Sequence, residues 1–344
     1  MNLHQGARPK QITEKFLCLT SQKIPPCFLV DDDLDFFVMK RTLYISSVVL
    51  AVIILLLTFW VIGASIQKKT PVSAYDDKPL ILVSVAPFSH MVSQIVDDTV
   101  NVVTVIPAHV DPHNWEPTYQ DMDKLKNATV WFTVGMGFEH PLEKKLLDVN
   151  PNLSIINLND HIEAIETKED GHQHCESIDT HTWLSPKLDM VIAQFINDTL
   201  TNLFPDSRSL YQENLLTLVK ELDELDKSIR QSLEPFAGEL LVTSHGAYSY
   251  FCKEFGLEQV VIEPSEGKEP RVKEISAMVK RLKADKRRIA VILTQPQHSN
   301  KGALLLAKEL KLVPYMLDPY APNYIDTMHR LTLLILAENG REAS

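Results

Sequence analysis

The sequence predicts an α/β protein of two lobes, each a mostly parallel sheet flanked by helices, joined by one long helix and preceded by a transmembrane or signal segment. From residue 80 onward, short runs rich in β-branched residues alternate with amphipathic stretches. This alternation is typical of parallel sheets covered by helices. Residues 206–233 carry a leucine stripe without Gly or Pro, and residues 43–66 carry no charge.

The uncharged segment is the first predicted element. Its 24 residues exceed the ~20 that cross a bilayer. Lys40 and Arg41 precede it, as in a signal sequence, so it is either a cleaved signal or a retained anchor. We expect residues 1–42 to form an extension, with the start codon at Met1 or Met39. Residues 67–79 read as a linker, and residues 70–344 are expected outside the cytoplasm.

Residues 80–205 are predicted to form the N-terminal lobe. The apolar runs read as strands, and the amphipathic stretches between or after them read as helices. The predicted strands are 80–85, 100–107, 130–134 and 153–158, and the helices are 120–128, 141–149 and 188–204.

Residues 206–235 are predicted to form the linking helix, bracketed by Pro205 and Pro235. Apolar residues recur there at three- and four-residue steps, which indicates a helix, and a coiled-coil partner helix is the alternative. Alternation then resumes in a C-terminal lobe, residues 236–344. Its predicted strands are 240–243, 260–263, 289–294 and 313–317, and its helices are 248–255, 272–286, 301–310 and 324–339.

The composition argues against two kinds of function, nucleic-acid binding and thiolate zinc binding. The formal net charge of −11 argues against a nucleic-acid partner, which would require a basic face. The four cysteines form no CxxC pair, so we expect no thiolate zinc site. An oxidising compartment would allow a Cys175–Cys252 disulfide, although the spacing does not require one.

Four polar residues beside prolines or strand ends predict a metal site: His113, His181, His245 and Asp318. They lie 68, 64 and 73 residues apart, far wider than the ligands of a zinc finger. Ligands in open α/β sheets bind beyond the carboxyl ends of strands, where three of these residues are expected. Three imidazoles and one carboxylate suit Zn²⁺, and suit Mn²⁺ or Fe²⁺ less tightly.

Each of these residues also has a plainer reading as a solvated or capping loop residue. Glu116 is either a ligand or a partner that orients His113. His172 and His174, in an acidic stretch, are either weak auxiliary ligands or part of a solvated loop. The histidines expected to be structural, loop or capping residues are His90, His109, His140 and His298.

From about residue 80 to 339 the chain resembles the cluster A-I, ZnuA/TroA-like family of metal-binding proteins. The resemblance rests on Asp-Pro-His-x-x-Glu-Pro at 111–117, Gly-Met-Gly-x-Glu at 135–139, His-x-Trp-Leu-x-Pro at 181–186, Ser-His with Tyr250 at 244–250, and Leu-Asp-Pro at 317–319. It implies His113, His181, His245 and Asp318 as ligands, and histidine in the third position implies zinc. Thr180 and Gly246 depart from the family pattern, which commonly has proline and aspartate there.

The resemblance also implies a function. The chain would be a periplasmic or extracytoplasmic solute-binding protein, anchored to the inner membrane if residues 43–66 are retained. It would deliver Zn²⁺, or alternatively Mn²⁺ or Fe²⁺, to an ABC permease with its ATPase subunit. A surface adhesin with a structural metal is a further alternative. We do not expect an enzyme, because four protein ligands leave no position for water and no HExxH helix occurs.

Overall fold

The computed structural model describes residues 32–65, 78–107, 109–112, 115–167, 177–263 and 269–342. The chain divides into two compact units, Met1–Val72 and Ser73–Ser344. In the first unit, helix α1 (Asp32–Ser65) covers most of the uncharged segment, and its described apolar side chains are exposed. None of the described helices has both the length and the hydropathy of a membrane span. The transmembrane or signal segment therefore stays a prediction.

The second unit begins with a four-stranded parallel sheet. Its strands are β1 (Leu80–Val83), β2 (Asn101–Thr104), β3 (Val130–Thr133) and β4 (Ser154–Asn157), in the order β2-β1-β3-β4. Every residue of the central strands β1 and β3 is buried, which accounts for their unbroken apolar sequences. A two-stranded antiparallel ribbon, β5 (Glu166–Thr167) with β6 (Ser177–Ile178), follows this sheet along the chain.

The helices of this lobe are α2 (Ala86–Val96), α3 (Tyr119–Leu125), α4 (Glu139–Val149) and α5 (Pro186–Leu203). The sequence indicated a helix start at His90, inside α2, but no range was predicted for this helix. This helix follows the β1 strand closely and has no side-chain cap at its start. Pro87 stands in its first turn, where a missing backbone N–H costs nothing.

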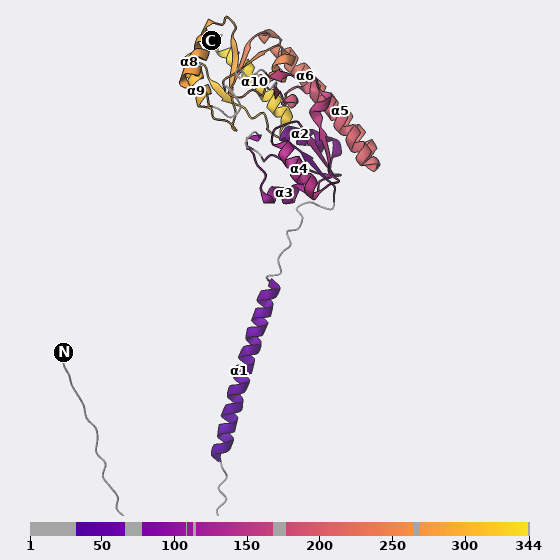
Figure 1. Cartoon of the computed structure of the whole chain (residues 1–344), viewed down its shortest axis with the longest axis vertical. Helices are drawn as coiled ribbons and strands as arrows, with labels where there is room; N and C mark the ends of the chain where they lie inside the picture. Colours follow the sequence, from indigo (N-terminus) through magenta and orange to yellow (C-terminus); the bar gives the residue numbers. More distant parts are fainter. Residues whose placement is uncertain are drawn as a thin grey trace, which may run out of the picture. The chain divides into compact units, whose positions relative to one another are not determined.

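One long helix, α6 (Arg208–Leu233), occupies the leucine-striped stretch. It lies beside α5, and it also packs against α2 and the C-terminal helix α10 (Tyr324–Glu342) (Figure 1). Its buried face is the predicted stripe together with Tyr211. Helix α6 therefore contacts elements that precede it and elements that follow it in the sequence, and it packs against both lobes.

The C-terminal lobe repeats the strand arrangement of the first. Its strands are β7 (Leu240–Thr243), β8 (Glu258–Val261), β9 (Ile289–Thr294) and β10 (Pro314–Met316), all parallel, in the order β10-β9-β7-β8. In both sheets the first strand lies between the second and the third, and the fourth lies outside the third. The helices are α7 (Ser249–Phe255), α8 (Val272–Ala284), α9 (Lys301–Leu310) and α10. The predicted fold class is confirmed.

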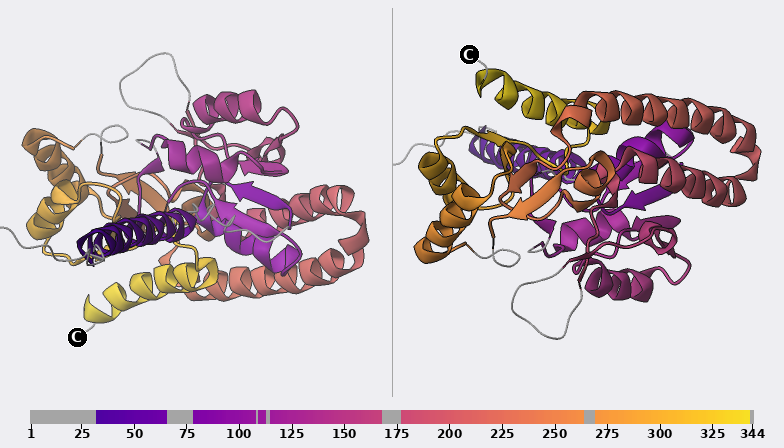
Figure 2. Two further views of the ribbon diagram at one scale, coloured as in Figure 1. Left: turned by 90° about the horizontal axis from the view of Figure 1, so that it is seen from below. Right: turned by 90° about the horizontal axis from the view of Figure 1, so that it is seen from above.

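Both faces of the C-terminal sheet are covered (Figure 2). Leu241 of β7 joins the main core, which runs through both lobes, whereas Leu240 and Val242 join a smaller core with α8 and α9. In the same lobe Cys252 is a buried free thiol, and burial raises its pKa. Cys175, its candidate partner, lies outside the described residues. The polar loops at the carboxyl ends of the strands thus rest on a sheet that is fixed from two sides.

Candidate metal site

The C-terminal sheet brings polar side chains together at the carboxyl ends of its four strands. His245 stands two residues after β7, Glu263 two after β8, His298 four after β9 and Asp318 two after β10. This is where open parallel sheets bind ligands. Three of these positions lie on adjacent strands, because β8, β7 and β9 follow one another in the sheet.

His181 comes from the other lobe, in the loop between β6 and α5. Its backbone N–H donates to Asp179 Oδ1 at 2.9 Å, and its ring Nδ1 lies 2.7 Å from the same oxygen. A carboxylate only accepts, so Nδ1 carries the hydrogen and Nε2 keeps a lone pair. The Tyr320 hydroxyl lies 2.9 Å from that Nε2. His181 is therefore held in the tautomer that binds a metal through Nε2.

The His181 loop is fastened to the C-terminal lobe. Trp183 Nε1 donates to the Pro319 carbonyl at 2.9 Å, and the Tyr250 hydroxyl donates to the Asp179 carbonyl at 3.0 Å. As a result the rings of His181 and His245 approach to 5.5 Å between centroids, although they belong to different lobes. Both are 3% exposed, which is rare for an imidazole in a loop.

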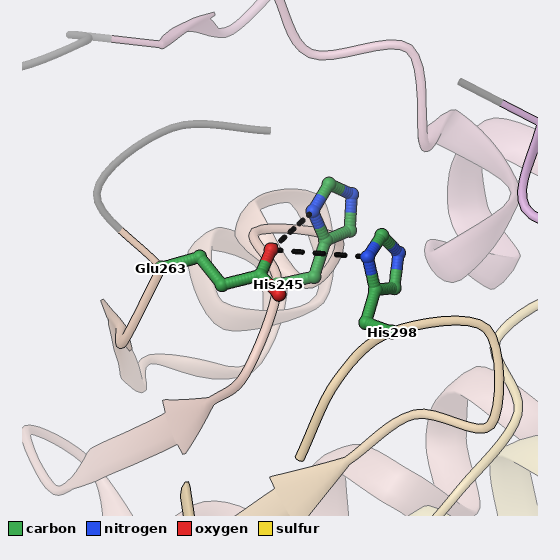
Figure 3. A group of neighbouring side chains, drawn as sticks. All are labelled: His245, Glu263 and His298. Atoms are coloured by element: carbon green, nitrogen blue, oxygen red, sulfur yellow. Dashed lines mark ion pairs between the residues drawn. The ribbon is translucent and has the colours of Figure 1, made fainter. Parts of the chain in front are cut away.

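His245 also has a carboxylate beside its Nδ1, since Glu263 Oε2 lies 3.7 Å away. The same oxygen lies 3.8 Å from Nδ1 of His298, whose ring stacks on that of His245 at 4.4 Å (Figure 3). A carboxylate at one nitrogen of a metal-binding imidazole typically fixes its tautomer and raises its basicity. His181 has this feature through Asp179, whereas the Glu263 oxygen lies near His245 at more than hydrogen-bond distance.

The Asp318 carboxylate is held from three directions. Its Oδ1 accepts hydrogen bonds from Gln297 Nε2 at 2.6 Å and from the Tyr320 backbone N–H at 2.9 Å. Its Oδ2 lies 3.5 Å from Nδ1 of His109, an exposed residue of the N-terminal lobe. Asp318 therefore lies where the two lobes meet, on the same loop as the tyrosine that contacts His181.

Of the predicted ligands, the structure brings His181 and His245 together and places Asp318 two residues from the tyrosine bonded to His181. Glu116 is exposed, and His113, His172 and His174 lie outside the described residues. The ligand set as a whole stays a prediction.

The sequence analysis missed Asp179, Glu263, His298 and Tyr320. His298 was expected in a loop or capping role, but its side chain is 2% exposed and faces Glu263. The available signals were a carboxylate two residues before His181 and another just past a predicted strand. Neither signal indicates by itself that the side chain turns towards a histidine.

Gly246, a departure from the family pattern, lies against β8. A Cβ added there would come within 3.2 Å of Val261 Cγ2, closer than an ordinary van der Waals contact. Glycine therefore lets the loop that carries His245 lie close to the strand that carries Glu263.

Two further carboxylates act on the scaffold around the site. Glu139 accepts backbone hydrogen bonds from Val134, Gly135 and Met136 at 2.6–2.9 Å, while its burial raises its pKa. Glu139 thereby clamps the turn after β3.

Glu254 of α7 joins elements of both lobes. It accepts a hydrogen bond from the hydroxyl of Ser185, the N-cap of α5, and its Oε1 lies 3.3 Å from Arg230 of α6. Burial, followed by the neighbouring Asp226 carboxylate, raises the pKa of Glu254 to about 7. This junction therefore contains a carboxyl group that titrates near neutrality.

Two lobes of like topology, with buried histidines facing each other where they meet, define the class of metal-binding solute-binding proteins. Residues 81–336 match the family described as "ZnuA: Zinc-uptake complex component A periplasmic". The chain belongs to this family, and the resemblance seen in the sequence is confirmed.

Individual relatives agree with this assignment. A "Putative metal-binding protein" of Chlamydia trachomatis is 32% identical over 252 residues, covering 72% of this chain and 87% of the relative. The "High-affinity zinc uptake system protein ZnuA" of Bacillus subtilis is 28% identical and covers 71% of this chain and 79% of its own length. A crystal structure of ZnuA is 29% identical, with a TM-score of 0.70, and covers 76% of this chain and 100% of its own.

Other relatives carry different metals. A zinc-bound ZnuA deletion mutant is 29% identical, with a TM-score of 0.69, covering 76% of this chain and 98% of its own. FpvC of Pseudomonas aeruginosa in complex with Ni²⁺ is 25% identical, with a TM-score of 0.66, covering 77% of this chain and 98% of its own. The family thus includes solute-binding proteins for more than one divalent transition metal.

Proposed function

We propose that this chain is an extracytoplasmic solute-binding protein that captures Zn²⁺ between its lobes and delivers it to an ABC importer. The ligands are His113, His181, His245 and Asp318, with Glu116 beside them. One observation carries the proposal: imidazoles of two lobes face each other, each with a carboxylate next to its Nδ1. The hydrogen bond to Asp179 leaves Nε2 of His181 for the ion.

The ligand chemistry favours zinc as cargo. Three imidazole nitrogens and one carboxylate oxygen complete a tetrahedral shell, the geometry that zinc prefers. Mn²⁺ favours a site richer in oxygen, so it is the weaker candidate, together with Fe²⁺. With all four positions taken by protein, no site for a reacting water is left, and the chain acts as a carrier and not as an enzyme.

The partners follow from the role. The chain passes the ion to a membrane permease that is driven by an ATPase subunit. Residues 43–66 hold it at the inner membrane, with the two lobes on the periplasmic or outer side. This part of the proposal rests on the absence of charge from that segment and on its length.

Metal competition tests the proposal. The full chain, purified in detergent and stripped of metal, is titrated with Zn²⁺, Mn²⁺ and Fe²⁺ against a chromophoric chelator. We expect one zinc ion per chain, bound more tightly than manganese, and weaker binding in H181A. Equal affinity of H181A and the unaltered chain would contradict the interlobe site. In cells, deletion should abolish zinc uptake, whereas intact uptake with lost attachment would indicate the adhesin alternative.

A further inference from the structure

We propose that His245, Glu263 and His298 bind a divalent transition-metal ion at a second site, contained within the C-terminal lobe. One ligand atom from each of these three side chains lies within 4.8 Å of the other two. The site shares His245 with the interlobe site but uses no ligand of the N-terminal lobe. Its existence can therefore be tested separately from the function proposed above.

The separations fit a shared ion. Glu263 Oε2 lies 3.7 Å from Nδ1 of His245 and 3.8 Å from Nδ1 of His298, and Figure 3 shows both rings turned towards that one oxygen. Hydrogen bonds would be shorter, at ~2.7–3.2 Å. Two zinc–ligand bonds of ~2.0–2.2 Å at a tetrahedral angle place their ligand atoms roughly 3.3–3.5 Å apart. Shifts of a few tenths of an ångström bring each nitrogen to that distance from the Glu263 oxygen, and all three ligand atoms already lie within 4.8 Å of one another.

Burial favours an ion here. The side chains of His245, Glu263 and His298 are only 4%, 5% and 2% exposed. A divalent ion bound by this carboxylate offsets its charge while both imidazoles stay neutral. Two nitrogens and one carboxylate oxygen suit Zn²⁺ or Fe²⁺, whereas Ca²⁺ and Mg²⁺ prefer ligand sets made of oxygen.

The scaffold is rigid. The three residues follow β7, β8 and β9, which are adjacent in a parallel sheet with helices on both faces. Sites built on such elements hold their geometry better than sites on loops alone. The parallel stacking of the His245 and His298 rings, with 12° between their planes, further limits rotation of either ring.

Sharing His245 couples the two sites. A neutral imidazole has one nitrogen with a lone pair, so His245 binds an ion through Nε2 or through Nδ1 but not through both. The two sites therefore exclude each other, and the chain holds one ion in total. Three protein ligands leave a coordination position open at the second site. An ion held there can exchange, which suits a first stop before transfer to the interlobe site.

The test removes two interlobe ligands that the second site does not share, His181 and Asp318, and leaves the C-terminal three. The full chain carrying H181A and D318N is titrated with Zn²⁺ against a chromophoric chelator. We expect one ion to bind still, and binding to be lost when H298A or E263Q is added. X-ray absorption of the zinc-loaded H181A/D318N chain should report two imidazoles and one carboxylate. H329A, an exposed histidine on α10, is the matched control and should change nothing.

Two results would overturn the proposal. The first is that H181A/D318N binds no zinc although its thermal unfolding matches that of the unaltered chain. The second is that H298A leaves its zinc affinity unchanged. If Glu263 only orients His245, E263Q weakens zinc binding in the unaltered chain and H181A/D318N binds none. The conservative H298Q replaces H298A if alanine lowers the melting temperature.

Discussion

The two sheets have the same strand order but use their carboxyl ends differently. In the C-terminal sheet, residues just past three adjacent strands converge: His245, Glu263 and His298. In the N-terminal sheet, the turn after β3 is clamped by Glu139. The C-terminal lobe presents a cluster of possible ligands at the end of its sheet. In the N-terminal lobe, the carboxylate after β3 stabilises the backbone of its own turn.

Among the described residues, the N-terminal lobe contributes His181 to the proposed site from a connecting loop. That loop is positioned by Asp179 from within and by Tyr250, Pro319 and Tyr320 from the opposite lobe. The comparison teaches that a repeated topology does not imply repeated site chemistry. The C-terminal residues of the site are held in place without an ion, whereas the position of His181 depends on contacts across the lobe boundary.

The largest predicted effect is a loss of zinc affinity, and it should differ between variants of His245 and of His181. Four-ligand zinc sites are worth ~10–16 kcal/mol, so one ligand contributes roughly 3 kcal/mol, or about 10²-fold in affinity. We expect H245A to lose at least this much, because His245 serves both sites. H181A should lose less, since the C-terminal cluster remains. Chelator competition measures both variants, and a greater loss in H181A would contradict the comparison.

The joint between the lobes should respond to pH through Glu254. Its pKa of about 7 exceeds that of a free glutamate, ~4.3, so between these values the folded chain binds more protons than the unfolded chain. The free energy of unfolding therefore falls as pH rises through this window. In metal-free E254Q, which cannot ionise, this loss should disappear.

Urea unfolding at pH 5 and pH 8 measures this effect. The difference between E254Q and the unaltered chain should be small at pH 5 and should favour E254Q at pH 8. An equal difference at both pH values would show that Glu254 does not titrate in this range.

Removing the Asp179 carboxylate, which contacts His181, should lower zinc affinity less than removing the histidine. Loss of such a partner typically lowers metal affinity ~10–100-fold, because the ring loses its fixed tautomer. We expect D179N to fall in this range, measured by zinc competition. D148N, an exposed carboxylate on α4, is the matched control. Unchanged affinity in D179N would mean that the contacts from the opposite lobe suffice to orient His181.

The smallest predicted effect concerns Tyr320. Its hydroxyl contacts Nε2 of His181, the atom proposed to bind the ion, so the ion must displace it. A hydrogen bond of this kind is worth ~0.5–1.5 kcal/mol, and Y320F should therefore bind zinc roughly 3- to 10-fold more tightly. Y119F, which alters an 86% exposed tyrosine, is the control. Weaker zinc binding in Y320F would show that the hydroxyl supports the bound ion.

The fold could be predicted from the sequence because the patterns that indicate strands and helices are local. The apolar runs at β1, β3 and β7 and the stripe of α6 report burial directly. The bounds of helix α2 were not predicted, because it follows its strand closely and has no capping side chain.

The site was predictable only in part. His181 and His245 stand in motifs, whereas Glu263 and His298 acquire meaning only when three strands lie side by side. Nothing in the order of residues along the chain indicates that Glu263 turns towards His245, or that Tyr320 reaches His181 across the lobe boundary. Such contacts between distant segments are a property of the folded chain.

Gly246 has a wider consequence. A methyl group at this position would press on Val261. Either the Val261 side chain or the loop that carries His245 would have to give by a few tenths of an ångström. G246A therefore asks how much displacement the pairing of His245 with Glu263 tolerates.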